Sequence, residues 1–329
     1  MAVKKVVRKV GKPSRKEKYR RKEAVVRRRS KMLADVSGLT LPDAPKEADT
    51  DFGNYLTLIY GRPGMGKSTF ASTYPDACFF SCERISKALE VFDLNEAKGG
   101  VTDWGVFRKG VELLEDNPDK FRTVVVDTID AAYQQCLEWV CKKKKIEHPQ
   151  DDGYGKGWNA VWTEFNGMLD RIIATGRGLV LTSHSKEIEI TAHSGDTYTR
   201  IQPSMSGQAY KAVKAKSDFV LYAEFIKDNS GKSRRVLITE GDEVVDAKSP
   251  ELDTPIPMYL PFPKKGGFDL VNRAFLGEDV GIPMETVKPA KATSKAGTDF
   301  IKKGQARAAA KKVARRNVKK GGPKKVRRA

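Results

Sequence analysis

The residues with the clearest chemical meaning form one run of eight, from Gly61 to Ser68. They read Gly-Arg-Pro-Gly-Met-Gly-Lys-Ser, which is the complete phosphate-binding pattern GxxxxGK[ST]. In this pattern the glycines let backbone N–H groups close around phosphate, the lysine neutralises the β and γ oxygens, and the hydroxyl serves Mg²⁺. ATP and Mg²⁺ are therefore the predicted cofactors. The predicted nucleotide-binding residues of the loop and the helix start are Gly61, Arg62, Pro63, Gly64, Met65, Gly66, Lys67, Ser68 and Thr69.

A second carboxylate is needed to complete the magnesium shell. It usually lies at the end of a neighbouring hydrophobic strand. The run Val-Val-Val-Asp that ends at Asp127 has this form, so Ser68 and Asp127 are the predicted metal ligands. From Asp127 alone, a cap on the following helix is an alternative, but the phosphate loop favours the metal ligand.

Hydrolysis also needs a group that orients the attacking water. Ring ATPases of the AAA+ type carry a glutamate directly after the magnesium aspartate, but here that residue is Thr128. Glu83, just beyond the apolar run Cys78 to Phe80, should reach the same edge of the sheet and is the predicted general base. The competing interpretation is an ordinary surface acid.

A fourth polar group follows another apolar run, Leu179 to Thr182, and is His184. A histidine at a strand end can hydrogen-bond the terminal phosphate and transmit its presence to the adjoining loop. The alternative is a solvent-exposed histidine with no role.

The elements that must position these groups alternate in type along the chain. Short apolar runs predict strands at 55–60, 77–81, 123–126 and 179–182, and helical patterns fall at 67–73, 106–115, 131–143 and 158–175. This alternation predicts a mostly parallel sheet covered on both faces. In the last helix, Trp158, Trp162, Phe165, Leu169 and Ile172 are expected on one face.

Residues 185–203 show a different pattern. Alternating apolar residues flank the turn signal His193-Ser194-Gly195-Asp196, which predicts a β-hairpin. Further strands are expected at 219–225 and 236–239, with a turn at 229–231 between them.

The order of these motifs along the chain, from the phosphate loop to His184, resembles that of the RecA-type core of phage ATP-binding proteins. The similarity is greatest to the Sak-four type of single-strand annealing ATPase, which is related to the RecA and RadA recombinases. It covers roughly residues 50–275, and it rests on the phosphate loop together with Glu83, Asp127, the run Gly155 to Trp158, His184 and the run Pro203 to Gly207. The resemblance implies a RecA-like P-loop NTPase core of the α/β class.

The resemblance also implies roles for particular residues. Glu83 and Lys67 would act in catalysis, and His184 would be the switch at the foot of a DNA-binding loop formed by Ser185 to Gln208. A second DNA-binding loop would span Lys145 to Trp158, and Lys248 would reach the nucleotide of an adjacent subunit. The DNA-binding candidates in the two loops are Lys156, Trp158, Lys186 and Arg200.

Charge divides the chain into an acidic body and two basic arms. Residues 1–32 hold 15 basic and 2 acidic residues, residues 288–329 hold 16 and 1, and the rest hold 30 and 39. Like-charged segments without aromatics cannot bury enough surface to offset their chain entropy, so the arms are expected to be disordered. The predicted organisation is a basic arm at 1–32, a linker at 33–53, an ATPase domain at 54–275, and a linker with a basic arm at 276–329. The arms are expected to contact nucleic acid, although an import signal and simple solubilisation are alternatives.

Composition excludes some classes of protein. No apolar run is long enough for a membrane span, the N-terminus lacks a signal peptide, and four cysteines in 329 residues make no disulfide framework. The cysteine spacings do not favour zinc, so small core residues are expected. The protein is therefore expected in the cytoplasm, which would be that of a bacterial host if a phage encodes it.

The predicted function is an ATPase that binds single-stranded DNA and promotes strand annealing or pairing. A homo-oligomer, ring or filament, and a single-strand-binding protein are the expected protein partners. Alternatives are a nucleic-acid motor or loader, a P-loop kinase of small molecules, and a non-catalytic DNA-coating protein switched by ATP.

Overall fold

The structure is a computed structural model that describes residues 44–191, 197–227, 231–252, 254–263 and 265–282. The chain divides into two units, Met1–Ala48 and Asp49–Ala329. Of the first unit, only residues 44–48 are described, and they are exposed without regular secondary structure. The basic arms predicted at 1–32 and 288–329 lie outside the described residues.

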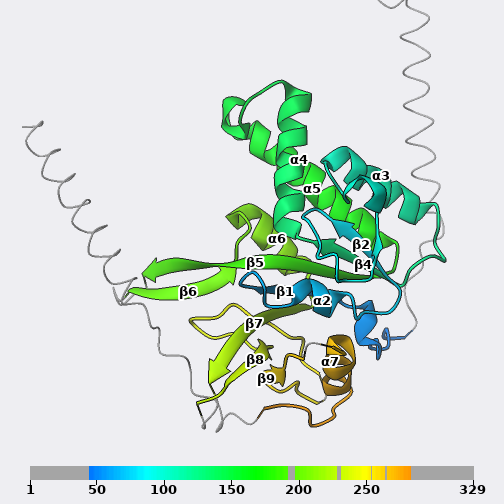
Figure 1. The fold of residues 1–329 in the computed structure, drawn as a ribbon. Coiled ribbons are helices and arrows are strands. Elements are labelled where there is room, and N and C mark those ends of the chain that lie inside the picture. The colour runs from blue at the N-terminus through cyan, green and yellow to red at the C-terminus, as the bar shows by residue number, and fades with distance from the viewer. Residues whose placement is uncertain (1–43, 192–196, 228–230, 253, 264, 283–329) are drawn as a thin grey trace, which may run out of the picture. The chain divides into compact units, whose positions relative to one another are not determined.

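A sheet of nine strands forms the centre of the second unit (Figure 1). Its strands are β1 (Leu56–Gly61), β2 (Ala77–Ser81), β3 (Phe92–Asp93), β4 (Thr123–Asp127), β5 (Gly178–Thr191), β6 (Thr197–Pro203), β7 (Phe219–Lys227), β8 (Ser233–Ile238) and β9 (Tyr259–Pro261). Their order is β3-β2-β4-β5-β1-β7-β8-β9, with β6 paired to β5 alone. The pairs from β3 to β7 are parallel, and β8, β9 and β6 add antiparallel pairs.

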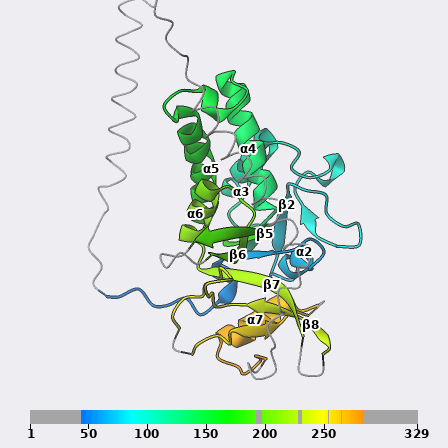
Figure 2. The same cartoon turned by 90° about the vertical axis from the view of Figure 1, so that its left-hand side faces the viewer.

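Helices cover both faces of this sheet (Figure 2). They are α2 (Lys67–Ala71), α3 (Trp104–Glu115), α4 (Ile129–Lys144), α5 (Lys156–Ala174), α6 (Gly207–Lys216) and α7 (Gly267–Phe275), with short 3₁₀ helices at Phe52–Asn54, Glu96–Lys98 and Pro149–Asp151. α3, α4, α5 and α6 pack on one face, and α2 and α7 on the other. Side chains of β1 alternate between the two cores: Leu58 and Tyr60 enter the first, Ile59 the second. The predicted α/β RecA-like P-loop NTPase fold, a mostly parallel sheet with β-hairpin additions, is confirmed.

The parallel strands bring their carboxyl ends to one edge of the sheet. β5 lies between β1 and β4, and Gly61 of β1 pairs with His184 of β5. On the far side of β4, Ser81 of β2 pairs with Asp127. The loops that follow β1, β2 and β4 therefore meet beside the end of the buried part of β5, which is where ligands bind in open α/β sheets.

Strand β5 differs from its prediction, which had a separate strand and hairpin. It runs without a break from Gly178 to Thr191 and forms both the buried strand and the first arm of the hairpin with β6. Its first six residues are buried between β1 and β4, whereas the later ones extend past these neighbours and are partly exposed. This change of surroundings explains the change from a continuous apolar run to alternation. The turn predicted at 193–196 lies outside the described residues.

The apolar face of α5 is shifted relative to its prediction. The buried stripe keeps the expected Phe165, Leu169 and Ile172 and adds Val161 and Met168, whereas Trp162 is 42% exposed. Trp162 therefore lies beside the stripe, and the prediction was wrong for this residue.

Near the N-terminus of the second unit, Phe52 belongs to the segment predicted to be a linker. It is fully buried in an aromatic cluster with Tyr74, Phe219, Phe268 and Phe275. At least this end of the segment thus packs into the body.

Three of the four cysteines, Cys78, Cys136 and Cys141, are buried, as expected for small core residues, while Cys82 is half-buried. Within the described ranges, no helix is long and apolar enough to cross a membrane.

Candidate functional site

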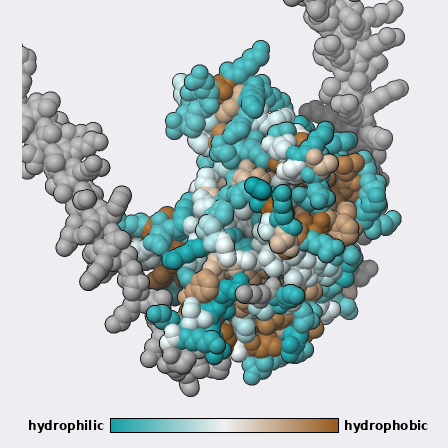
Figure 3. All heavy atoms as spheres, viewed as in Figure 1, coloured by the Kyte–Doolittle hydropathy of each residue, from teal (hydrophilic) through white to brown (hydrophobic). Residues whose placement is uncertain are grey.

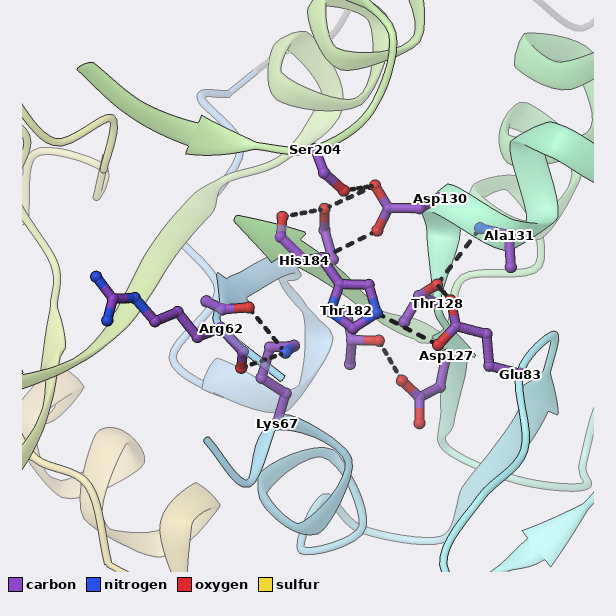
Figure 4. Close-up of polar contacts among 12 residues, drawn as sticks. Arg62, Lys67, Glu83, Asp127, Thr128, Asp130, Ala131, Thr182, His184 and Ser204 are labelled. Carbon is purple, nitrogen blue, oxygen red and sulfur yellow. Dashed lines mark hydrogen bonds and ion pairs between the residues drawn. The ribbon is translucent and has the colours of Figure 1, made fainter. Parts of the chain in front are cut away.

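The phosphate loop connects β1 to α2, as its position in the sequence predicts. Gly64 and Gly66 have φ angles of +77° and +94°, in the left-handed region that favours glycine. Lys67 begins α2 and is only 6% exposed. Its Nζ donates hydrogen bonds to the carbonyl oxygens of Gly61 at 2.9 Å and Arg62 at 3.1 Å (Figure 4). The ammonium is thus held by the loop that it serves, and among the described residues no carboxylate forms an ion pair with it.

The electrostatics of Lys67 fit an anion-binding role. Burial lowers the pKa of its ammonium, while the nearby carboxylates of Asp127, Asp130 and Glu83 act in the opposite direction. Because burial is the larger effect, the ammonium is incompletely compensated by its surroundings. A bound phosphate would supply the missing negative charge.

Asp127 stands at the end of β4 and is 6% exposed. Its Oδ1 accepts a hydrogen bond from the Thr182 hydroxyl of β5. In the described part of the chain, no donor reaches Oδ2, and no cluster of three or more His, Cys, Asp or Glu side chains could hold a metal by itself. This donor set fits Mg²⁺, which proteins commonly bind through one or two side chains together with substrate phosphates. Asp127 and the half-buried Ser68 would supply those side chains.

Glu83 is brought to Asp127 by backbone hydrogen bonds. The N–H groups of Cys82 and Glu83 both donate to the Asp127 carbonyl, at 2.8 and 3.2 Å. The Glu83 carboxylate then accepts a hydrogen bond from Thr128 Oγ1 at 2.8 Å through Oε1. Its side chain is 45% exposed, so it can reach a water molecule. Thr128, which stands where ring ATPases have a glutamate, thus supports a carboxylate from the segment that follows the neighbouring strand β2.

His184 completes this group of side chains. Its Nε2 lies 3.3 Å from Glu83 Oε2, and its Nδ1 has no hydrogen-bond partner among the described residues. The structure therefore brings Lys67, Asp127, Glu83 and His184 together at one edge of the sheet (Figure 4).

Asp130 is a site residue that the sequence interpretation missed. It lies in the first turn of α4, and its Oδ1 accepts hydrogen bonds from Ser183 Oγ at 3.1 Å and Ser204 Oγ at 2.6 Å. Its Oδ2 accepts from the backbone N–H of His184 at 3.0 Å. Asp130 thus joins the end of buried β5 to the residue that follows β6. An aspartate in a first helical turn is common for reasons of charge alone, so the sequence carried little signal for this role.

Two predicted nucleotide-binding residues stand apart from this group. Arg62 is exposed, and its side chain points away from Lys67 in Figure 4. Lys248 pairs through its backbone with Val220 of β7, and its Nζ donates to the carbonyl of Lys214 at 3.2 Å. Val220 lies opposite Leu58, three residues before Gly61, so Lys248 is not a ligand of its own phosphate loop. A contact between Lys248 and the nucleotide of an adjacent subunit stays a prediction.

Of the four DNA-binding candidates, the two on the hairpin are engaged within the chain. Lys186 donates to the Met205 carbonyl at 2.6 Å, and Arg200 forms an ion pair with the buried Asp246 at 3.3 Å. Lys156 at the start of α5 is exposed, and Trp158 is half-buried with its ring edge against His148. The structure does not bring the two pairs together.

With this geometry established, comparison with known proteins identifies the family. Residues 54–250 match the AAA domain family, which covers more than half of the chain. The chain belongs to the AAA domain family. The AAA domain contains the phosphate loop, Glu83, Asp127, Asp130 and His184, and it is a nucleotide-binding domain of the P-loop ATPase type.

Individual proteins resemble this AAA domain more distantly. The SPbeta prophage-derived uncharacterized protein YorG of Bacillus subtilis (strain 168) is 24% identical over 176 residues, which are 52% of this chain and 50% of the relative. The chain thus spans about half the length of the curated relative it matches. Among solved structures, the flagellar accessory protein FlaH from Methanocaldococcus jannaschii matches 56% of this chain and 77% of its own, with 9% identity and a TM-score of 0.30.

Proposed function

We propose that this AAA domain protein hydrolyses ATP, binds single-stranded DNA, and promotes strand annealing or pairing in phage-type recombination or replication, as a Sak-four-type protein would. The observation that carries the proposal is the continuity of β5. One strand begins in the buried sheet, passes the phosphate loop at His184, and continues into the hairpin with β6. A change at the nucleotide therefore has a direct mechanical path to a projecting element, as DNA-coupled ATP hydrolysis requires.

The side chains can divide the work of hydrolysis among them. Lys67 and the backbone N–H groups of the loop would hold the phosphates, while Ser68 and Asp127 would hold Mg²⁺. The metal would supply positive charge to the phosphate oxygens when bound. Glu83 would orient water and take its proton as the water oxygen attacks the γ-phosphorus and the bond to the β-phosphate oxygen breaks.

Asp130 and His184 are the proposed route from the nucleotide to the hairpin. His184 contacts Glu83, and its backbone is held to Asp130, which also holds Ser204 behind β6. When the γ-phosphate is lost, His184 would change its hydrogen-bond partners. The change would reach β5 through His184 itself and β6 through Asp130 and Ser204. The described part of the hairpin exposes Glu187 and Glu189, so the positive charge that DNA needs would come from other surfaces, and the hairpin would transmit the change rather than hold the strand by itself.

DNA contact is better supported at the α4–α5 end of the molecule. Four consecutive exposed lysines occupy the last three positions of α4 and its C-cap, 142–145, and Lys156 stands at the start of α5. Of these, Lys144 pairs with Asp152. Tyr154 between these helices is fully exposed and can stack on a base. Hydrophilic residues dominate this end in Figure 3. With the basic arms, this surface would attract the phosphate backbone of single strands.

A homo-oligomer, either a ring or a filament, is proposed because Lys248 does not serve the phosphate loop of its own chain, and its ammonium would turn from the Lys214 carbonyl to the nucleotide of an adjacent subunit. A single-strand-binding protein is a further proposed partner. The proposed compartment is the cytoplasm of a bacterial host.

ATP turnover with and without single-stranded DNA, followed by annealing of complementary strands, tests the proposal. We expect turnover that DNA stimulates and annealing that depends on ATP. Lys67→Ala protein is the control for contaminating ATPases. Turnover without a response to DNA would refute the coupling, DNA-stimulated turnover without annealing would indicate a motor or loader, and phosphorylation of a small molecule would indicate a kinase. ATP binding without turnover would identify a DNA-coating protein.

The arms are tested separately by a salt titration of single-strand affinity. Proteins lacking residues 1–32 and 288–329 should bind more weakly and with less salt dependence, because each lost phosphate contact removes about 0.7 from the slope of log K against log salt. Turnover without DNA should stay unchanged. An unchanged slope with poorer solubility would mean that the arms only solubilise.

A further inference from the structure

Arg235 is a basic residue beside the phosphate loop that the proposed mechanism does not use. It lies on β8 and pairs with Phe225 of β7. β1 ends against β7 at the pair Gly61 and Ala223, so Phe225 and Arg235 are already past the end of β1. The β7–β8 pair therefore extends alongside the phosphate loop, and Arg235 is placed to reach it.

Two contacts hold the Arg235 side chain, and a backbone hydrogen bond holds the strand that carries it. Its Nη1 donates a hydrogen bond to the carbonyl oxygen of Met65 at 3.0 Å. Its guanidinium carbon lies 5.2 Å from the ring centre of the buried Phe262, whose backbone N–H donates to the Arg235 carbonyl at 3.0 Å. Within the described part of the chain, no carboxylate pairs with this guanidinium. The positive charge is thus directed at the loop rather than neutralised.

The contact with Met65 fixes the direction of one peptide unit. In a trans peptide, the carbonyl of residue 65 and the N–H of residue 66 point in opposite directions. Because the Met65 carbonyl points to Arg235, the Gly66 N–H points away from Arg235. A hydrogen bond from a cation to this carbonyl also polarises the peptide and makes the N–H a stronger donor.

We infer that Arg235 is a positioning residue for nucleotide binding, which orients and polarises the Met65–Gly66 peptide so that the Gly66 N–H binds a phosphate oxygen. The inference rests on the proposed nucleotide-binding function of the loop. The space at Gly66 agrees with it, since a Cβ there would lie 3.0 Å from Arg235 Nη1. Gly66 thus provides both the left-handed turn and room for the arginine.

Three variants test the role of Arg235, with ADP and a non-hydrolysable ATP analogue as probes. Arg235→Met keeps the apolar contact with Phe262 but removes the charge and the hydrogen bond. Arg235→Lys keeps the positive charge and a group that can donate a hydrogen bond to the Met65 carbonyl. Arg234→Met is the matched control, because Arg234 is exposed on the same strand and its side chain points to the other face.

Arg235→Met should raise the Kd for both nucleotides about tenfold, since one charge-assisted hydrogen bond is lost. Its KM for ATP should rise more than its kcat falls. Arg235→Lys should recover part of the affinity, and Arg234→Met should bind as the wild type does. Thermal unfolding without nucleotide serves to check that each variant is folded.

The outcomes separate this inference from the function on which it rests. Wild-type affinity in folded Arg235→Met would overturn the role of Arg235 alone. A loss of stability without a change in Kd would show a merely structural residue and would also overturn it. If the wild-type protein binds neither probe, the nucleotide-binding function fails, and this inference fails with it.

Discussion

Two groups of polar residues, each built around a buried aspartate, adjoin the hairpin, and they differ in how completely their hydrogen bonds are made. The first is the phosphate-loop group of Lys67, Asp127, Glu83 and His184. The second, called here the Asp246 cluster, consists of Asp246 with Tyr60, Arg200, Tyr210 and Lys214. The Asp246 carboxylate accepts from Tyr210 and Lys214 and pairs with Arg200, while its backbone carbonyl accepts from Tyr60.

In the phosphate-loop group, by contrast, some donor and acceptor atoms have no hydrogen-bond partner among the described residues. Lys67 has only loop carbonyls as partners, and Asp127 Oδ2 and His184 Nδ1 have none among the described residues. Buried polar groups normally find partners, so an incomplete set signals a ligand, whereas a complete set signals structure. The two groups are linked by Tyr60, which immediately precedes the phosphate loop and donates to Asp246.

The largest expected effect comes from removing the cation of the incomplete group. Lys67→Ala should abolish ATP binding or turnover, because Lys67 is the one loop ammonium buried against the proposed phosphate position, and folding should survive. Nucleotide titration and a turnover assay, with circular dichroism as the control for folding, would check this. Wild-type turnover in the folded variant would contradict the assignment of the loop.

Glu83→Gln should separate chemistry from binding. The amide keeps the shape of the side chain but cannot accept a proton, so turnover should fall by about 10² to 10⁴-fold. Affinity for Mg·ATP should remain, as measured with a fluorescent analogue. Asp127→Asn is the informative counterpart, because it should weaken the Mg²⁺ dependence of binding. If Glu83→Gln hydrolyses normally, another group activates the water.

A substitution in the Asp246 cluster should change the stability of the protein rather than its ATP turnover. Asp246→Asn should lower the free energy of unfolding by about 2 kcal/mol, because it removes a buried charge that accepts hydrogen bonds from partly exposed cationic side chains, while nucleotide affinity should change little. Asp170→Asn is the matched control: Asp170 pairs with Lys216 but is 53% exposed, so a loss of at most about 1 kcal/mol is expected.

The Asp246 effect should also depend on pH. Burial raises the pKa of this carboxyl, but the hydrogen bonds from Lys214 and Tyr210 outweigh it, and the net pKa lies below the usual value. Its stabilising contribution is therefore complete above the unfolded-state pKa of about 3.9 and is lost as the pH falls through the lower folded value. Urea denaturation should show the gap between wild type and Asp246→Asn closing only in acid. A gap that does not depend on pH would mean that ionisation is irrelevant.

The smallest expected effect concerns the connection between the site and the hairpin. Ser204→Ala removes one hydrogen bond to Asp130 and should cost about 1 kcal/mol of stability. Its turnover without DNA should stay unchanged, while its stimulation by DNA should fall severalfold. Ser206→Ala, which removes the N-cap of α6, should cost a similar amount but keep full stimulation. Equal stimulation in the two variants would contradict the proposed route.

Particular elements show how far the sequence could be interpreted. The strands 77–81 and 123–126 were predicted to within a residue, because they are buried on both faces and read as continuous apolar runs. α6, α7 and β9 were missed. They are short, and β9 has only three residues, so their formation depends on packing against the sheet rather than on local pattern.

The same distinction applies to the functional residues and to the residues that support them. The phosphate loop was complete in the sequence, because its chemistry is contained in eight consecutive residues. Glu83, Asp127 and His184 could be found because parallel strands must end at one edge. Asp130, Arg235 and Asp246 could not, since Asp130 meets Ser204 across 74 positions, Arg235 meets Met65 across 170, and Asp246 meets Tyr60 across 186. The sequence thus determined the nucleotide chemistry and the alternating fold, which depend on neighbouring residues. The tertiary structure alone decided what supports that chemistry, because each supporting contact joins segments brought together only by strand order and by the packing of helices on the sheet.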